Sequence, residues 1–209
     1  DNYSIGTKDN HQEGVKYING DVCEIEHLID NDFDYCFHLA GLSRIQPSFD
    51  CPEETFSSNT NGVLKVLEWA KNSKTKIVYS GSSSKHHNPL ISPYATFKFL
   101  GEEICKLYRN AFNSNIEIVR FYNVYGPYEI IEGDWAALIG KWRGQIKNSK
   151  SLTIVGDGNQ RRDFTHVEDI VDGLIKIAFS EHSNADAWEL GTGINYSIKE
   201  VFELFKNKF

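Results

Sequence analysis

The stretch KIVYSGSSSKHHNPLISPYATFK, residues 76–98, holds the pattern that decides the fold. Its first residues are apolar and β-prone, which predicts a strand buried on both faces. A serine-rich loop follows this strand. Ser92 and Pro93 then have the residue types that are favoured at an N-cap and at the first position of a helix. The stretch therefore predicts a strand, a short loop and a helix in succession.

The rest of the chain repeats this alternation of short β-rich runs and longer amphipathic segments. We expect strands over residues 15–20, 34–41, 76–81, 116–126, 152–158 and 187–193. We expect helices over residues 24–29, 53–72, 92–112 and 135–147, and two more that open at Thr165 and Ser197. Glu168 and Glu200 follow those two openings at capping-box spacing. Strands that alternate with helices predict right-handed crossovers and a mostly parallel sheet, so the expected fold class is α/β.

Length and composition indicate a globular chain. The 209 residues are 40% hydrophobic and 24% charged, which suits one large core, or one core with a smaller lobe. No run of about 18 apolar residues is present to span a bilayer, and no signal peptide opens the sequence. The net charge of −7 argues against binding to a nucleic-acid backbone. We therefore expect a cytoplasmic protein with neither membrane nor nucleic-acid partners.

The cysteines give no sign of a metal site or a disulfide framework. They form no CxxC pair and have no close histidine partner, and they are Cys23, Cys36, Cys51 and Cys105. We interpret them as reduced thiols, and we expect no bound metal.

Three polar motifs follow predicted strands at their carboxyl ends. They are HLAG (residues 38–41), SGSSS (residues 80–84) and FYNVYG (residues 121–126). In open parallel sheets, ligands bind in the crevice outside the carboxyl ends of the strands. We therefore expect the three motifs to line one crevice.

Tyr94 and Lys98 stand one helical turn apart, so they share a face of the predicted helix. A tyrosine with its ordinary pKa of about 10 is a poor base at neutral pH, but a nearby ammonium stabilises the phenolate. Ser82, at the end of the preceding strand, is placed to hydrogen-bond a substrate hydroxyl or carbonyl. A surface Tyr/Lys pair after a hydrated serine loop is the alternative. The strand end, serine cluster and capped helix favour a proton-transfer site.

The sequence resembles the extended short-chain dehydrogenase/reductase family, and within it the nucleotide-sugar epimerases of the UDP-galactose 4-epimerase type. The resemblance runs in collinear order through nearly all of the chain. Its motifs are DNYSIG, GDV, FHLAGLSRIQPS, NTNG, IVYSGSSS, SPYATFK, RFYNVYGP, IVGDGNQRRDFTHVED and LGTG. Each motif is weak alone, but the ordered set is specific.

The resemblance implies an architecture and a catalytic set. It implies a Rossmann-like, doubly wound parallel sheet over residues 1–125 and a small substrate-binding lobe over residues 126–209, with some segments returning to the Rossmann core. It implies that Tyr94 is the catalytic base and that Lys98 is its partner and binds the nicotinamide ribose. Ser82 is the third member, although Ser83 or Ser84 takes its place if the register differs.

The resemblance also implies NAD as cofactor and a nucleotide-diphosphate sugar, foremost a UDP-sugar, as substrate. The implied cofactor contacts are Asp1, Asn2, Asp21, Val22, Leu39, Ala40, Gly41, Asn59, Tyr94, Lys98 and Phe121. An acid at the first of these suits the free 2′-hydroxyl of NAD and repels the phosphate of NADP. The implied substrate contacts are Ser82, Asn123 and Arg162, the last being suited to a diphosphate. Relatives dimerise through the helices that match residues 53–72 and 92–112, so a homodimer is expected.

The sequence departs from the family pattern in three places. The glycine-rich turn that seats the NAD pyrophosphate is absent, and we expect it in an N-terminal βα unit of about thirty residues upstream of Asp1. The family also continues beyond the last residue. The loop from Ser82 to Tyr94 is shorter than in many epimerases. The glycines at 191 and 193 precede a capped helix, and we interpret them as a turn.

The residues after Ser82 bear on the reaction. Sugar 4,6-dehydratases of this family have Asp-Glu there and decarboxylases have a nearby Glu, whereas this chain has Ser83, Ser84 and Lys85 and no carboxylate until Glu102. This difference favours epimerisation at C4 through a transient 4-keto sugar. The alternatives are a nucleotide-sugar dehydratase, an NAD(P)-dependent keto-sugar reductase and a non-catalytic NAD-binding regulator.

Overall fold

A computed structural model describes residues 1–208 of the chain. Its contacts divide the chain into two compact units. The first unit comprises residues 1–120 and 174–188, and the second comprises residues 121–173 and the segment that begins at Glu189. Each unit has a hydrophobic core of its own. The domain boundary expected at residue 125 stays a prediction.

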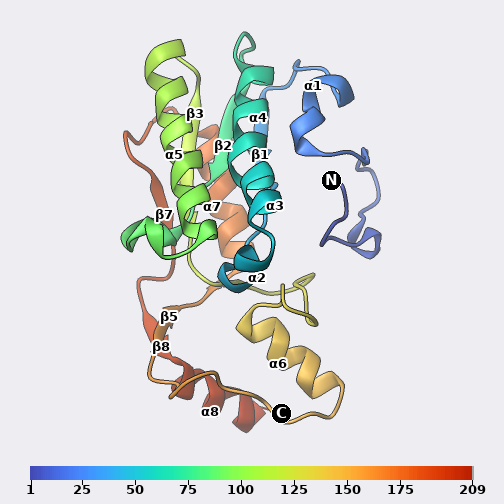
Figure 1. Cartoon of the computed structure of the whole chain (residues 1–209), viewed down its shortest axis with the longest axis vertical. Helices are drawn as coiled ribbons and strands as arrows, with labels where there is room; N and C mark the ends of the chain where they lie inside the picture. Colours follow the sequence, from blue (N-terminus) through green and yellow to red (C-terminus); the bar gives the residue numbers. More distant parts are fainter. Residues whose placement is uncertain (209) are drawn as a thin grey trace. The chain divides into compact units, whose positions relative to one another are not determined.

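The first unit is built on a sheet with the strand order β1-β2-β3-β7 (Figure 1). Its strands are β1 (Tyr35–His38), β2 (Lys76–Ser80), β3 (Ile116–Phe121) and β7 (Trp188–Leu190). The first three run parallel, with His38 opposite Tyr79 and Ser80 opposite Val119. Every residue of β2 is buried, as expected for a strand covered on both faces. The predicted α/β class and parallel sheet are confirmed.

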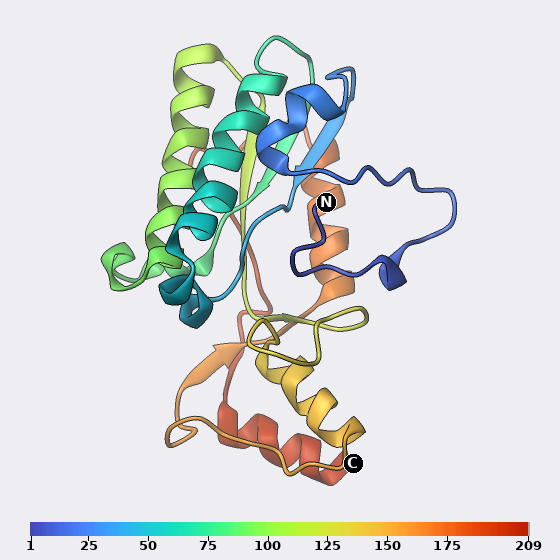
Figure 2. The same cartoon turned by 45° about the vertical axis from the view of Figure 1, so that its right-hand side comes forward.

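Helices cover both faces of this sheet. They are α1 (Ile25–Leu28), α2 (Ile45–Asp50), α3 (Pro52–Phe56), α4 (Gly62–Ala70), α5 (Pro93–Phe112) and the last turns of α7 (Val167–Phe179). A π-helical turn, Ser57–Asn61, joins α3 to α4, so the long helix predicted over residues 53–72 is confirmed with a bulge. In Figures 1 and 2, α4 and α5 lie side by side on one face and the end of α7 lies on the other.

The start of α5 follows the sequence signals closely. The Ser92 hydroxyl accepts a hydrogen bond from the Ala95 N–H at 3.1 Å, and Pro93 occupies the first helical position. The helix ends at Asn113, whose positive φ of 54° closes it with a hydrogen bond to the Tyr108 carbonyl. The predicted helix over residues 92–112 is therefore confirmed at both ends.

The second unit combines short strand pairs with helices. Its elements are β4 (Val124–Tyr125), α6 (Leu138–Lys147), β5 (Arg161–Asp163), β6 (Thr165–His166), the first turns of α7, β8 (Asn195–Ser197) and α8 (Ile198–Lys208). β4 pairs with β6 in parallel, and β5 pairs with β8 in antiparallel orientation. The fully buried Trp142 of α6 packs edge-on against Phe202 and Phe205 of α8. The capping box of Ser197 and Glu200 is confirmed, with reciprocal hydrogen bonds of 3.2 and 2.6 Å.

Two predicted strands are wrong. Residues 15–20 form no strand, and their backbone instead meets the first residue: the Asp1 amino group donates to the Ile18 carbonyl and Gly20 donates to the Asp1 carbonyl. Residues 152–158 form no strand because α6 side chains satisfy the backbone. The Trp142 indole donates to the Thr153 carbonyl at 2.8 Å. β-prone residues without a partner strand do not form a ladder.

The helix predicted to open at Thr165 begins two residues later. Thr165 pairs with Val124 in an extended conformation, and its hydroxyl donates to Asp163. α7 then begins at Val167, where the His166 ring accepts a hydrogen bond from the Glu168 N–H at 3.4 Å. Strand pairing therefore overrides the capping-box pattern, and His166 lies at the helix start.

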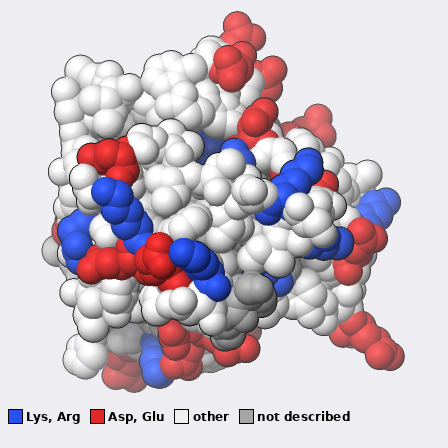
Figure 3. All heavy atoms as spheres, turned by 90° about the horizontal axis from the view of Figure 1, so that it is seen from below, with Lys and Arg blue, Asp and Glu red and all other residues white. Residues whose placement is uncertain are grey.

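The surface mixes charges of both signs. On the face in Figure 3, basic and acidic side chains of the described residues alternate in small groups without a continuous basic band. Within residues 1–208, no helix is both long enough and apolar enough to cross a membrane. The same residues hold no cluster of three or more potential metal ligands, and all four cysteines are free.

Candidate active site

The carboxyl ends of β1 and β2 meet, as the sequence predicts. The Ser80 hydroxyl donates to the His38 carbonyl at 3.1 Å, which joins the two strand ends. β2 then passes through Gly81 into a 3-10 turn, Ser83–His86, for which Ser82 is the N-cap. A second 3-10 turn, Pro89–Ile91, leads into α5. The short loop is therefore two successive tight turns.

Ser82 is the serine that faces Tyr94. The two hydroxyl oxygens are 3.2 Å apart, close enough for a hydrogen bond in either direction. Ser84 donates to the Ser82 hydroxyl from its backbone N–H at 3.2 Å and from its hydroxyl at 2.9 Å. In this geometry Ser84 supports Ser82 and does not replace it.

α2, which the sequence analysis missed, contributes to the placement of Tyr94. The Ser48 hydroxyl on α2 accepts a hydrogen bond from the Tyr94 N–H at 3.1 Å. Arg44, just before α2, acts electrostatically on the phenol. Burial raises the pKa of Tyr94 above its usual value, while the Ser82 hydrogen bond and Arg44 lower it. Arg44 is thus a cation that favours the phenolate, and the same effect of Lys98 stays a prediction.

Lys98 is buried, and its ammonium donates to the Ser80 carbonyl at 2.5 Å. It also lies 4.8 Å from the centre of the Tyr79 ring. Burial lowers the pKa of Lys98 to about 8, against an opposing effect of the Glu102 carboxylate. Among the described residues, the hydrogen-bond partner of Lys98 is the end of β2 and not the Tyr94 phenol.

A pocket of about 470 Å³ adjoins the carboxyl end of β1. Seven of the predicted cofactor residues line it: Asp1, Asn2, Asp21, Val22, Leu39, Ala40 and Gly41. The walls also include Tyr3, Tyr17, Ile25 and Leu28. Residues from three separate segments of the first 42 positions therefore line one cavity.

The acidic end of this pocket is held by short hydrogen bonds. Asp21 accepts from the Cys23 N–H at 2.9 Å and from the Asn2 side chain at 2.8 Å. These bonds lower the pKa of Asp21, the backbone bond being the larger cause. Asp1 accepts from the Tyr3 N–H at 2.6 Å. Fixed carboxylates of this kind suit the hydroxyls of a ribose.

Asn59 holds the part of the pocket wall formed by Gly41 and Leu42. Its amide donates to the Leu42 carbonyl and accepts from the Leu42 N–H, both at 2.8 Å. A Cβ atom at Gly41 would lie 2.6 Å from the Asn59 oxygen, so only glycine fits there. Position 41 thus presents bare backbone to the pocket, as close approach of a dinucleotide requires. These residues fit NAD.

Of the predicted substrate residues, Ser82 belongs to the first unit, and Asn123 and Arg162 belong to the second. The Asn123 side chain donates to the Asp163 carbonyl at 2.9 Å, and Arg162 lies exposed on β5. The Asp163 carboxylate, which the sequence analysis did not single out, accepts from Thr192 and Gly193 and so holds the predicted turn. Phe121, at the end of β3, also belongs to this unit.

Comparisons with known proteins give matches over most of the chain. A family model described as "NAD dependent epimerase/dehydratase family" matches residues 1–191. The UDP-glucuronate 4-epimerase of Thermodesulfobacterium geofontis is 32% identical over 81% of this chain and 55% of its own length. UDP-N-acetylglucosamine 4-epimerase from Methanobrevibacter ruminantium, solved with UDP-N-acetylmuramic acid, is 29% identical with a TM-score of 0.89, over 99% of this chain and 72% of that chain.

A third comparison includes the cofactor. UDP-glucuronic acid 4-epimerase from Bacillus cereus, solved with UDP-glucuronic acid and NAD, is 26% identical with a TM-score of 0.77. The match covers 90% of this chain and 62% of that chain. The chain spans 72% of the length of one curated relative and 55–60% of five others. The fold is therefore the Rossmann-like fold of these epimerases.

Proposed function

Because this chain belongs to the NAD dependent epimerase/dehydratase family, we propose that it epimerises a nucleotide-diphosphate sugar at C4 through a transient 4-keto sugar. NAD is the cofactor of this family. The single observation that carries the finer proposal is the 3.2 Å contact between the Ser82 and Tyr94 hydroxyls at the end of β2. We take the substrate to be a UDP-sugar, since relatives of this fold are solved with such ligands.

The chain's own residues provide the proton chemistry. Tyr94 accepts the proton of the sugar 4-hydroxyl as general base and returns it when the 4-keto sugar is reduced. Ser82 hydrogen-bonds the same oxygen and stabilises the charge that develops on it. Arg44 and the Ser82 hydrogen bond both lower the pKa of Tyr94, against the effect of burial, and so assist ionisation. This pair therefore suits a reversible alcohol-to-ketone reaction.

The residues that would hold NAD are those of the 470 Å³ pocket, with Lys98 at the nicotinamide ribose. When bound there, NAD supplies the acceptor and then the donor of the hydride that leaves and returns to C4. Asp1 and Asp21 place fixed negative charge at the adenosine end, which favours NAD over NADP. Gly41 leaves room for the dinucleotide to approach the backbone.

Dehydration is the competing reaction in this family, and the surroundings of Ser82 oppose it. A dehydratase needs an acid that can give a proton to the leaving hydroxyl. Lys85, in the turn after Ser82, is paired with Glu103 at 3.1 Å. Glu102 lies against the Ser82 backbone, but both of its oxygens accept from Arg120 and it is 1% exposed. Such a carboxylate is not available as a proton donor.

The test is a C4 interconversion assay on the purified full-length protein. UDP-glucose, UDP-galactose and their N-acetyl and uronic acid forms are each followed by proton NMR. We expect one gluco/galacto pair to interconvert, with NAD retained through purification. Tyr94→Phe is expected to lower kcat by at least about 100-fold, because it removes the base.

Each alternative gives a different result in the same assay. A 4-keto-6-deoxy product indicates a dehydratase, and stoichiometric consumption of added NAD(P)H indicates a reductase. Tight NAD binding with no turnover of any sugar indicates a regulator. Full activity in Tyr94→Phe would overturn the proposed site even if epimerisation were found. A Tyr35→Phe variant, which changes a tyrosine at the start of β1 outside the 470 Å³ pocket and keeps the ring contact with Phe179, serves as the control for folding.

We also propose that the protein is a homodimer formed through α4 and α5. Apolar side chains stand exposed on these helices and on the adjoining α3, at Phe56, Leu64, Leu100, Leu107 and Phe112. A second copy that packs the same helices together would bury them as a four-helix bundle.

A further inference from the structure

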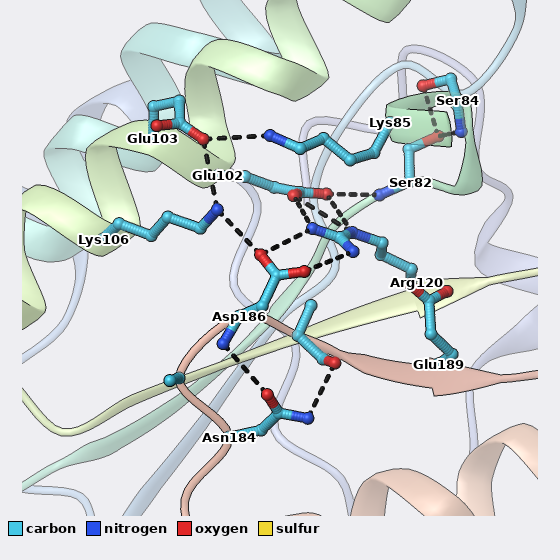
Figure 4. Close-up of polar contacts among 12 residues, drawn as sticks. Ser82, Ser84, Lys85, Glu102, Glu103, Lys106, Arg120, Asn184, Asp186 and Glu189 are labelled. Atoms are coloured by element: carbon cyan, nitrogen blue, oxygen red, sulfur yellow. Dashed lines mark hydrogen bonds and ion pairs between the residues drawn. The ribbon is translucent and has the colours of Figure 1, made fainter. Parts of the chain in front are cut away.

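A buried carboxylate underlies the contact between Ser82 and Tyr94. Glu102 lies on α5 two helical turns after Tyr94, and its side chain is 1% exposed. Its Oε1 atom accepts the backbone N–H of Ser82 at 3.2 Å (Figure 4). The helix that carries Tyr94 is thus bonded directly to the residue that faces it.

Arg120 on β3 neutralises this carboxylate. Its Nη2 donates to Glu102 Oε2 at 2.7 Å, and its Nε lies 3.1 and 3.2 Å from the two oxygens. Asp186 accepts from the other side of the same guanidinium at 3.0 and 3.2 Å. A buried carboxylate without such a partner would be strongly unfavourable. Arg120 therefore allows Glu102 to be charged beside Ser82.

From Arg120, ion pairs between alternating acidic and basic side chains continue to the protein surface. Asp186 also pairs with Lys106 at 2.9 Å, and Glu103 pairs with Lys106 and Lys85 (Figure 4). Three anions and three cations thus link the surface of α5 to the backbone of Ser82. Because Glu102, Glu103 and Lys106 lie on α5, while Ser82 and Lys85 follow β2, these contacts hold the helix and the end of β2 together.

The space between Gly81 and the Glu102 carboxylate is too small for a side chain at position 81. A Cβ atom at position 81 would lie 2.5 Å from Glu102 Oε1 and 3.1 Å from an Ile118 methyl carbon. Real Cβ atoms do not approach an oxygen so closely, so a methyl group there would displace the carboxylate. The glycine before Ser82 is therefore required by the Glu102 contact.

We propose that Glu102 is a positioning residue of the reaction centre, whose carboxylate holds the Ser82 backbone so that the Ser82 hydroxyl stays on the Tyr94 phenol. The proposal rests on the proposed function, because it assigns Ser82 and Tyr94 to one reaction. Glu102 touches neither substrate nor cofactor in this role. It acts through Ser82.

The Tyr94 phenol reports on this positioning without any turnover. The charged and titratable groups around it are Arg44 before α2, Tyr79 on β2, and Lys98 and Glu102 on α5. Burial raises the pKa of Tyr94, the Ser82 hydrogen bond lowers it, and the Glu102 charge raises it. Loss of the Ser82 contact and loss of the Glu102 charge should therefore shift this pKa in opposite directions.

Two variants separate the two effects. Glu102→Gln keeps an oxygen for the Ser82 N–H and removes the charge, so the pKa of Tyr94 should fall. Gly81→Ala pushes the carboxylate away, which loses the Ser82 contact and weakens the Glu102 effect. Because the Ser82 hydrogen bond affects the pKa of Tyr94 more than the Glu102 charge does, this pKa should rise, and kcat should drop by roughly 10- to 100-fold. The KM for the sugar should be unchanged in Glu102→Gln, which keeps the Ser82 contact. Glu203→Gln, an exposed glutamate of α8 whose lysine partner is Lys206, lies outside this network; it is the control and should change neither quantity.

The pKa of Tyr94 is measured by phenolate absorbance, as the difference from Tyr94→Phe in the same background. Opposite shifts in Glu102→Gln and Gly81→Ala support the proposal. An unchanged pKa in folded Gly81→Ala overturns it, and this result suffices if Glu102→Gln does not fold. Wild-type protein with no epimerase activity would overturn the proposed function, while the titration would still decide whether Glu102 positions Ser82.

Discussion

The ammonium of Lys98 donates to the carbonyl oxygen of Ser80, which joins the first half of α5 to the last residue of β2. Both residues are buried. The same lysine is expected to bind the nicotinamide ribose of NAD. Lys98 therefore has a hydrogen-bond partner within the protein, and its ammonium is buried.

This burial makes the stability of the protein depend on pH. The pKa of Lys98 falls from 10.5 to about 8, with burial as the main cause. Between these values the unfolded chain binds more protons than the native state, so the contribution of Lys98 to stability rises with pH. The full shift corresponds to about 3 kcal/mol. Urea unfolding of wild type and Lys98→Met between pH 8 and 10 should show wild type gaining stability relative to the variant; a constant difference would contradict this.

A methyl group at position 41 should damage the cofactor pocket. The Cβ atom of Gly41→Ala would lie 2.6 Å from the Asn59 oxygen, and the paired hydrogen bonds between Asn59 and Leu42 would be displaced. We expect a loss of about 1–3 kcal/mol of stability together with weaker NAD binding. Calorimetric titration with NAD and urea unfolding measure the two effects. Gly6→Ala, whose Cβ would meet Asp1 at an ordinary 3.4 Å, should keep wild-type stability.

Asp163→Asn should weaken binding of the nucleotide-diphosphate sugar without affecting NAD. Its two oxygens accept from Gly193 at 2.8 Å and from Thr192 at 2.7 and 3.1 Å, and an amide nitrogen cannot accept. The change should release the backbone that also receives the Asn123 side chain. Titration with UDP and with NAD tests the two sites separately. Asp157→Asn, another turn carboxylate of the second unit, is the control, and equal UDP affinity in both variants would contradict the prediction.

A charge on the exposed face of α5 should separate the proposed dimer. Leu107 is 55% exposed on this helix, and a buried carboxylate at a subunit contact is strongly unfavourable. Light scattering should give twice the monomer mass for wild type and the monomer mass for Leu107→Glu. Leu204→Glu, at an exposed position of α8, should leave the mass of wild type unchanged. A monomeric wild type would contradict the proposal directly.

Local signals were enough to predict the centre of the candidate site. The run before Ser82 lies within β2, and the Ser92 cap and the four-residue spacing of Tyr94 and Lys98 lie within α5; the structure forms both elements. The two wrong strands, over residues 15–20 and 152–158, had the right composition. They lack partners to pair with, and partners are set by the rest of the fold.

The residues that support Ser82 and Tyr94 could not be predicted from the sequence, because their contacts join segments that are far apart in the chain. Glu102 and Arg120 are 18 residues apart, and Asp186 lies 66 residues further on. α2 was missed because Pro47 lies inside it and its six residues show no apolar period. Ser48 on that helix nevertheless holds the Tyr94 backbone. Such contacts can be identified only from the three-dimensional arrangement of the strands and helices.

The close approach of Gly81 to Glu102 limits which substitutions the two positions can accept. Position 81 admits no side chain while a glutamate reaches it from position 102. An aspartate at 102 is shorter by one methylene and would free space for an alanine at 81. The two positions should therefore covary among natural relatives, and the double variant should be better tolerated than Gly81→Ala alone.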